Sequence, residues 1–310
     1  LYSLLSTLYS LLFTLSTILQ WPETMINTFS IFTTLSSAGS NLLIPDCELT
    51  TMRTSDAFYL KQLVFSFSTP FIVICVVIAW STMYGIFGRR CKWSLKQLKN
   101  FIILSIVMSL FLAYPMLVKI CLSMLKCVKV GEHRYLVADL QEPCFYGRHN
   151  NYVLAVFLPQ FILHVIGLPA IAFWIVKRAK NKFVDVRGQK IAMYHAYDFR
   201  LRYGLLYMGY REDREWWEVV IAGRKVVIVA IGTFGTLLGL VDVQAFVALA
   251  AIFAAILIHL VGEPFDVEDA EVRVLHKLEF TALTLAWMTF WGGLFFYLGH
   301  DRPGAIRYLF

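Results

Sequence analysis

Long runs of apolar residues, separated by shorter polar and charged stretches, dominate this chain. A helix needs about 20 predominantly apolar residues to cross the roughly 30 Å hydrocarbon core of a bilayer. Seven segments meet or approach that length: 1–20, 57–87, 101–128, 151–176, 216–240, 244–262 and 276–299. The pattern predicts an all-α, polytopic transmembrane helical bundle, with about seven spans in one domain over residues 1–310.

Both ends of the sequence suggest that the chain is part of a larger protein. It begins at Leu1 rather than at a methionine, directly in an apolar run, and its last residues, 304–310, resemble the first turns of another element. We therefore expect a C-terminal fragment of a longer protein.

Composition supports a membrane protein. Hydrophobic residues make up 58% of the chain and charged residues 16%, whereas soluble domains have roughly 45–50% and 25%. The net charge of +7 does not indicate nucleic-acid binding, because the basic residues gather in loops beside the apolar runs. No nucleic-acid partner is expected.

The distribution of lysine and arginine predicts the orientation of the spans. The loops after the second, fourth and sixth segments carry 17 basic residues, most of them in the loop 177–215. The opposite loops, 21–56 and 129–150, hold only Arg53, Lys129, Arg134 and Arg148. Because cytoplasmic loops carry an excess of basic residues, loops 21–56 and 129–150 are expected to face outward, with the protein in a plasma or ciliary membrane.

The cytosolic loop 177–215, which includes a short helix before the fifth span, is the predicted contact with lipid head groups. Its first basic residues are Lys177, Arg178, Lys180 and Lys182. A basic residue beside an anionic inner leaflet contributes about 1 kcal/mol of attraction. Anionic membrane lipids are therefore expected partners.

Two cysteines fall in the predicted outer loops. Cys47 and Cys144 would face an oxidising compartment, which favours disulfide formation, so we predict a Cys47–Cys144 bond that joins the two outer loops. The alternative is two unpaired cysteines. A zinc site built from His133, Cys144 and His149 is disfavoured because a fourth ligand and a compact spacing are missing.

Charged residues at one depth of the membrane form the main candidate site. Arg224 and Lys225 lie inside the fifth apolar segment, and the sixth and seventh segments bring His259, Glu263 and Glu279 to the same level. Ionisable groups inside a bilayer are costly unless they are paired. Two interpretations follow: a gate or ion path lined by these groups, or an ion-pair belt that locks three helices together.

Trp216 and Trp217 open the fifth segment. Tryptophan rings gather at membrane–water interfaces, and we predict that both anchor this span there. Further along the same segment, Gly235 and Gly239 have the small-residue spacing of close helix contacts, either within the chain or with a second copy in a homo-oligomer.

No enzyme constellation is present. The sequence has no GxxxxGK[ST] phosphate loop, no GxSxG elbow and no HExxH motif. We predict a protein that is not an enzyme, with no catalytic residue, cofactor or bound metal.

The stretch 202–225, RYGLLYMGYREDREWWEVVIAGRK, followed by an apolar span, resembles the membrane domain of the TRP-like family. That family includes fungal flavin-carrier and TRP-like proteins and the membrane ends of large algal and protist surface proteins. The resemblance is carried by Arg202, Tyr203, Gly204, Leu206, Tyr207, Tyr210, Trp216, Trp217, Glu218, Arg224 and Lys225.

The resemblance implies a polytopic region that follows a large ectodomain, in some members described as an ion channel. A TRP-type pore needs a re-entrant stretch between its last two spans, but the outer connection between the fifth and sixth segments is only about residues 241–243. We therefore expect a membrane module that anchors and assembles a larger cell-surface protein, with its own ectodomain or other membrane subunits as partners. A TRP-like cation channel or transporter subunit is the alternative.

Overall fold

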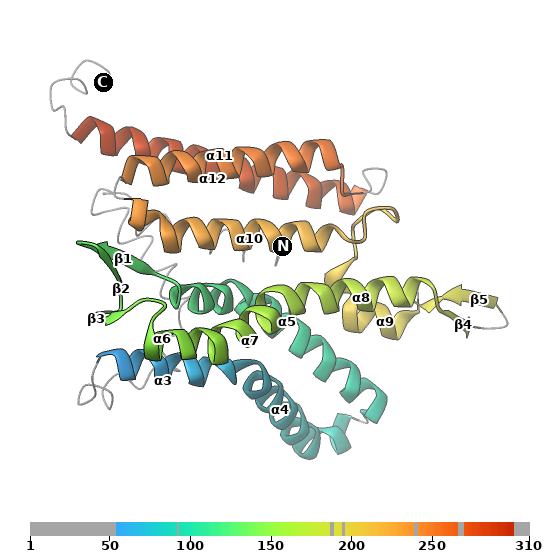
Figure 1. Ribbon diagram of the computed structural model, residues 1–310. Helices are drawn as coiled ribbons and strands as arrows, with labels where there is room; N and C mark the ends of the chain where they lie inside the picture. The colour runs from blue at the N-terminus through green and yellow to red at the C-terminus, as the bar shows by residue number, and fades with distance from the viewer. Residues whose placement is uncertain are drawn as a thin grey trace.

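The computed structural model of the chain describes residues 54–91, 93–186, 189–193, 196–238, 241–265 and 270–300 (Figure 1). The first predicted span, 1–20, lies outside these residues. So do Cys47 and most of the predicted outer loop 21–56.

The described residues form a mainly helical protein. The first half contains α3 (Thr54–Ser66), α4 (Ser68–Cys91), α5 (Leu95–Ser123), α6 (Gly147–Tyr152), α7 (Leu158–Gln160) and α8 (Leu168–Lys180). The second half contains α9 (Tyr197–Tyr203), α10 (Trp217–Phe234), α11 (Val241–Gly262) and α12 (Ala270–His300). Six of the seven predicted segments are therefore helical.

Four of these helical stretches are long and apolar enough to cross a membrane: Ser68–Gly88, Leu95–Ser123, Gly147–Lys180 and Val243–Gly262. The prediction of a helical, membrane-type fold is confirmed in this form. The described residues do not establish the count of seven. The helix α10 is not among the four, and within its 18 residues it carries the charged side chains Glu218, Arg224 and Lys225.

The start of α5 has a strong sequence signal. Ser94 is its N-cap, and its side chain accepts a hydrogen bond from the Lys96 amide, while the Gln97 side chain accepts one from the Ser94 amide at 3.0 Å. This reciprocal capping box satisfies backbone groups that a helix end leaves without partners. It fixes the turn between α4 and α5.

The span from α6 to α8 is one helical rod with two π-helical turns, η2 (Val153–Phe157) and η3 (Phe161–Gly167). Pro169 has no backbone N–H, so the carbonyl of Val165, four residues earlier, loses its usual helical partner. The Tyr114 hydroxyl on α5 donates to that carbonyl at 3.0 Å. The irregular backbone is thus satisfied by the neighbouring helix, as a membrane interior requires.

Two small antiparallel sheets occupy connections that were expected to be loops. One has the order β1 (Cys127–Val130), β2 (His133–Leu136), β3 (Asp139–Pro143), and the other pairs β4 (Phe183–Val186) with β5 (Gln189–Ala192). They lie at opposite ends of the helical bundle (Figure 1).

The buried core has α10 at its centre. In Figure 1, α10 lies between the α11–α12 pair and the layer that contains α5 and α8. Ile228 packs with Ile252 and Phe290 on the α11–α12 side, while Ala222 and Val229 pack with Val118 of α5. A helix with apolar contacts on two sides is the natural place to hold polar groups away from lipid.

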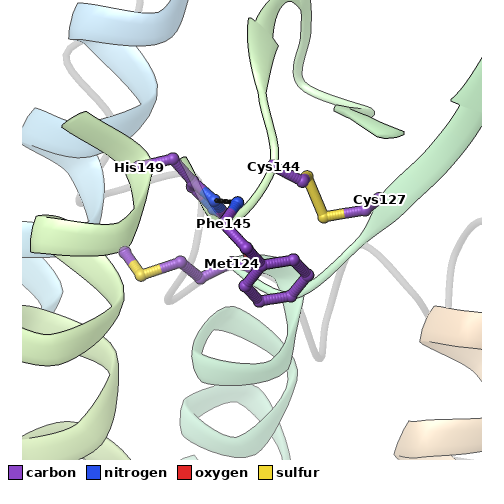
Figure 2. The surroundings of a disulfide bond; sticks show 5 residues. All are labelled: Met124, Cys127, Cys144, Phe145 and His149. Carbon is purple, nitrogen blue, oxygen red and sulfur yellow. Dashed lines mark hydrogen bonds between the residues drawn. A yellow bond between two sulfur atoms is a disulfide. The ribbon is translucent and has the colours of Figure 1, made fainter. Parts of the chain in front are cut away.

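The disulfide pairing predicted from the sequence is wrong. Cys144 bonds to Cys127, not to Cys47, with the two Cα atoms 6.3 Å apart (Figure 2). Cys127 begins β1 and Cys144 directly follows β3. The irregular register of the middle strand sets Pro143 opposite Tyr135, which also pairs with Val128, so both cysteines lie at the same end of the sheet. Cys127 falls at the end of the apolar segment 101–128, so the sequence does not place it in a predicted outer loop.

His149 completes the same structure. The Phe145 amide donates to Nδ1 of His149 at 2.9 Å (Figure 2), and Nε2 lies 3.1 Å from the Met124 carbonyl. Because Nδ1 accepts, Nε2 carries the proton and donates to Met124. Cys144 lies in a disulfide and both ring nitrogens of His149 are hydrogen-bonded, so neither residue is available as a zinc ligand beside His133.

The Cys127→Ser variant should lose about 3 kcal/mol of unfolding free energy. The two cysteines are 17 residues apart in the sequence, and the loss of chain entropy on closing a loop of about 15 residues in the unfolded state corresponds to that value. Cys75→Ser is the matched control, since Cys75 is an exposed free cysteine on α4. Chemical denaturation in detergent measures both variants. Equal stability of Cys127→Ser and the parent, or a peptide map that links Cys144 to Cys47, would contradict the assignment.

Candidate functional site

The candidate site forms where the connection before α10 meets the connection after α11. The Arg211 amide donates to the Pro264 carbonyl at 2.9 Å, and Tyr210 and Phe265 form an isolated β-bridge. Gly209 precedes this contact with φ +96°, and a Cβ there would lie 3.1 Å from Leu275. Glycine is suited to this backbone conformation, so the sequence places a glycine where the chain turns toward α12.

A buried ion pair joins α10 to α12. Nη2 of Arg224 lies 3.0 Å from Oε1 of Glu279, and the two side chains are 11% and 4% exposed. Of the two glutamates that the sequence placed at the level of Arg224 and Lys225, the structure pairs Glu279 with Arg224. Removing one partner of such a pair leaves an uncompensated buried charge, which costs about 3–5 kcal/mol.

Glu263 does not belong to this buried group. Its side chain is 72% exposed and lies 3.6 Å from Arg211. It follows the end of α11 at Gly262, so the chain has already left the helix when it reaches this residue. The predicted place of Glu263 in the intramembrane cluster is therefore wrong.

Lys225 faces the other side of α10. Its side chain is 1% exposed, and Nζ lies 3.9 Å from the centre of the Phe111 ring on α5. Successive helical residues point about 100° apart, so neighbouring cations on α10 face different helices. No carboxylate oxygen of the described residues lies within 4.0 Å of the Lys225 ammonium.

Tyr210 and Glu218 extend the polar group toward the connection. The Tyr210 hydroxyl donates to Oε2 of Glu218 at 2.9 Å. Burial, followed by the negative charge of Glu218, raises the pKa of Tyr210 well above its ordinary value. The phenol therefore keeps its proton and remains the donor.

Two histidines stack in the same region. The rings of His259 on α11 and His276 on α12 have centroids 4.9 Å apart and an interplanar angle of 15°, and Phe265 lies 5.8 Å from each. His259 is 1% exposed, and neither of its ring nitrogens has a hydrogen-bond partner among the described residues. The stack extends the cluster to the ends of α11 and α12.

The predicted interface tryptophans differ from each other. Trp216 is 39% exposed, whereas Trp217 is 4% exposed. The Trp217 ring packs against the end of α11, where a Cβ on Gly262 would lie only 2.0 Å from Cη2 of the ring. The prediction that Trp217 anchors the span at the interface is wrong, because this glycine gives its ring room to pack inside the protein.

The basic residues at the end of α8 and just after it, which were predicted to contact lipid, differ in their surroundings. Lys180 Nζ lies 2.9 Å from Oε1 of Glu215 and donates to the Glu212 carbonyl at 2.7 Å. Lys177 and Arg178 lie over the rings of Phe173 and Trp174, and Lys182 is exposed. Lys180 thus fixes the connection before α10.

Sequence reasoning missed the roles of Tyr210, Glu218 and Phe111. Glu218 lies one residue past the tryptophan pair and seven before Lys225, which places both on one face of α10. That spacing was a visible signal for Glu218. The approach of Tyr210 and Phe111 depends on tertiary packing and has no local signal.

Among curated proteins, the chain is similar to the cysteine repeat modular protein A of Toxoplasma gondii, with 25% identity over 151 residues. The matched region is 48% of this chain and 5% of that protein. The chain therefore aligns with a small fraction of that relative's length. No family model and no solved structure matches the chain.

Gly262→Ala should destabilise the protein by about 1–3 kcal/mol, because the added methyl group meets the Trp217 ring and overpacking costs that amount. Gly223→Ala is the matched control on α10, where a Cβ meets nothing within 4 Å. Alanine there should be neutral or stabilising by about 0.5–1 kcal/mol. Thermal unfolding compares the two, and an unchanged midpoint for Gly262→Ala would contradict the packing of Trp217.

Proposed function

We propose that this chain is the membrane module of a larger cell-surface protein, which it anchors in the bilayer and holds in a fixed arrangement. The observation that carries the proposal is the combination of apolar, span-length helices with a relative in which the matched region is 5% of the protein. A segment of that kind accounts for membrane attachment of a much longer chain.

The proposed topology follows the distribution of basic residues. We place α10 and α12, together with residues 1–20, among seven spans, with the basic connections in the cytosol and β1–β3 outside. The connections after α4, α8 and α11 lie toward one end of the bundle, and β1–β3 lies at the other (Figure 1). The sidedness fits a plasma or ciliary membrane, with Lys177, Arg178 and Lys182 near anionic lipid.

The end of the bundle that bears β1–β3 supplies a rigid platform for an ectodomain or another subunit. Arg148 contacts Asp56 at 2.6 Å and Glu142 at 2.9 Å, and the Ser55 amide donates to Asp139 at 3.0 Å. Tyr59 stacks on Tyr152 with ring centres 4.0 Å apart. With the disulfide, these contacts tie α3, β3 and α6 together.

A cation channel or transporter subunit of the TRP-like family is the second candidate. The stacked rings of His259 and His276 favour it, because ionisable groups inside a membrane mark ion paths as well as structural pairs. Against a TRP-type pore, η6 (Gly235–Leu238) is followed by α11 at Val241, so no re-entrant filter fits between them. The closed ion pair favours the anchor.

Reconstitution of the 310-residue chain in liposomes separates the two functions. An anchor should give cation flux equal to that of empty liposomes. Glu279→Gln should then lower thermal stability and yield by breaking the buried pair, a loss of about 3–5 kcal/mol.

Glu263→Gln is the matched control for this experiment. The same chemical change at an exposed pair should alter stability by less than about 0.5 kcal/mol. The opposite result has two parts: cation flux exceeds that of empty liposomes, and Glu279→Gln changes this flux without changing the yield of protein. That result would contradict the anchor and establish the channel.

A further inference from the structure

The chain enters the helical rod α6–α8 through a turn whose backbone is unusual for its residues. Phe145 has φ +63° and Gly147 has φ +51°. Glycine adopts such angles at little cost, whereas a bulky side chain in this region is an outlier that persists only where the surrounding structure holds it. Residues held in this way cluster at functional positions, so the turn is a candidate for a role of its own.

Phe145 is held from both sides. Its amide donates to Nδ1 of His149 at 2.9 Å, and the preceding residue, Cys144, is bonded to Cys127 (Figure 2). The rings of Phe145 and His149 also meet edge to face, with centroids 5.5 Å apart. Because His149 belongs to α6 and Cys127 to β1, the turn is fixed to both the rod and the sheet.

The turn presents two aromatic side chains that the rest of the protein leaves partly uncovered. Phe145 is 44% exposed and Tyr146 is 73% exposed. Figure 2 shows the Phe145 ring pointing away from the disulfide, toward the end of α5. Both rings are therefore available to whatever surrounds the protein at this level of the bundle.

The length of the rod relates this turn to the thickness of a bilayer. Gly147–Lys180 is long and apolar enough to cross a membrane, and near its other end it carries the exposed Trp174, with Arg178 over the ring. Tyr146 and Trp174 lie about 28 residues apart, which is about 42 Å at a rise of 1.5 Å per residue. A bilayer with its head groups is roughly 40–45 Å thick. With Trp174 in one head-group layer, Tyr146 reaches the other.

We propose that Phe145 and Tyr146 insert into the head-group layer of the outer leaflet and anchor the three-stranded sheet to the membrane. Aromatic rings gather at this level of a bilayer, where their apolar bodies contact lipid and the tyrosine hydroxyl contacts water. The partner is phospholipid, because the turn lies level with the head groups. The proposal rests on the proposed topology, in which the rod spans the bilayer, and it is compatible with either proposed function.

The anchor gives the strained turn a role. The disulfide and His149 fix the direction of the Phe145 ring relative to both the sheet and the rod. Insertion of the ring therefore sets the orientation of the sheet over the membrane. A flexible turn would let the rings enter the lipid without orienting the sheet.

The test uses the 310-residue chain in phosphatidylcholine nanodiscs, with the photoreactive residue benzoylphenylalanine in place of one side chain at a time. In place of Tyr146, the probe should form covalent phospholipid adducts, which mass spectrometry identifies. Ile162, exposed in the middle of the rod, is the control for the span and should give such adducts as well.

Glu132, exposed in the turn between β1 and β2, is the control for the sheet. The strands carry this turn about 13 Å from Cys127, which is farther than the roughly 5–8 Å thickness of one head-group layer. The probe in place of Glu132 should therefore give about tenfold less adduct than the probe in place of Tyr146.

Adducts at Ile162 but not at Tyr146 would overturn the anchor and leave the topology intact, whereas adducts at neither position would overturn both. Equal adducts at Tyr146 and Glu132 would overturn the anchor, because lipid contact would not be specific to the turn. A crosslink from position 146 to protein would overturn it in favour of another subunit or another part of this chain. Thermal unfolding identifies a Tyr146 variant that fails to fold, and the same probe in place of Phe145 then decides the result.

Discussion

The buried ion pair between Arg224 and Glu279 is the interaction on which the arrangement of the helices depends. It joins α10 to α12 where both side chains are almost fully excluded from solvent. In such surroundings neither charge is stable without the other. The relative rotation of the two helices is therefore restricted to positions at which the charges meet.

This restriction also determines which side chains of α10 are directed toward α5. With Arg224 directed to α12, Lys225 is directed to α5 and reaches the ring of Phe111. Glu218 lies two turns earlier on the same face and receives the Tyr210 hydroxyl. One helix thus carries a closed ion pair on one side and a partly satisfied donor and acceptor on the other.

The sequence predicted the positions of the helices better than the contacts between their side chains. Apolar length was enough to locate six helical segments among the described residues, because burial of long apolar runs needs little information from the rest of the chain. It also placed Arg224 and Glu279 at one depth. It did not distinguish Glu279 from Glu263, since that choice depends on where α11 ends and the chain turns away.

Side chains whose environment depends on tertiary packing were assigned less well. The partner of Cys144 depends on a three-stranded sheet whose first strand begins at Cys127 and whose last strand ends one residue before Cys144, and no local pattern showed that residues 127–143 form such a sheet. Trp217 has the sequence context of an interface residue, but the absence of a side chain on Gly262 allows its ring to pack inside. In both cases a contact between residues far apart in the sequence overrides the local preference.

A double-mutant cycle on the ion pair tests the account most directly. Arg224→Met and Glu279→Met should each lower the unfolding free energy by about 3–5 kcal/mol. The double variant should lose less than the sum of the two, with a coupling energy of at least about 2 kcal/mol, because it leaves no unmatched charge. Additive losses would show that the two side chains do not stabilise each other and would contradict the central place given to this pair.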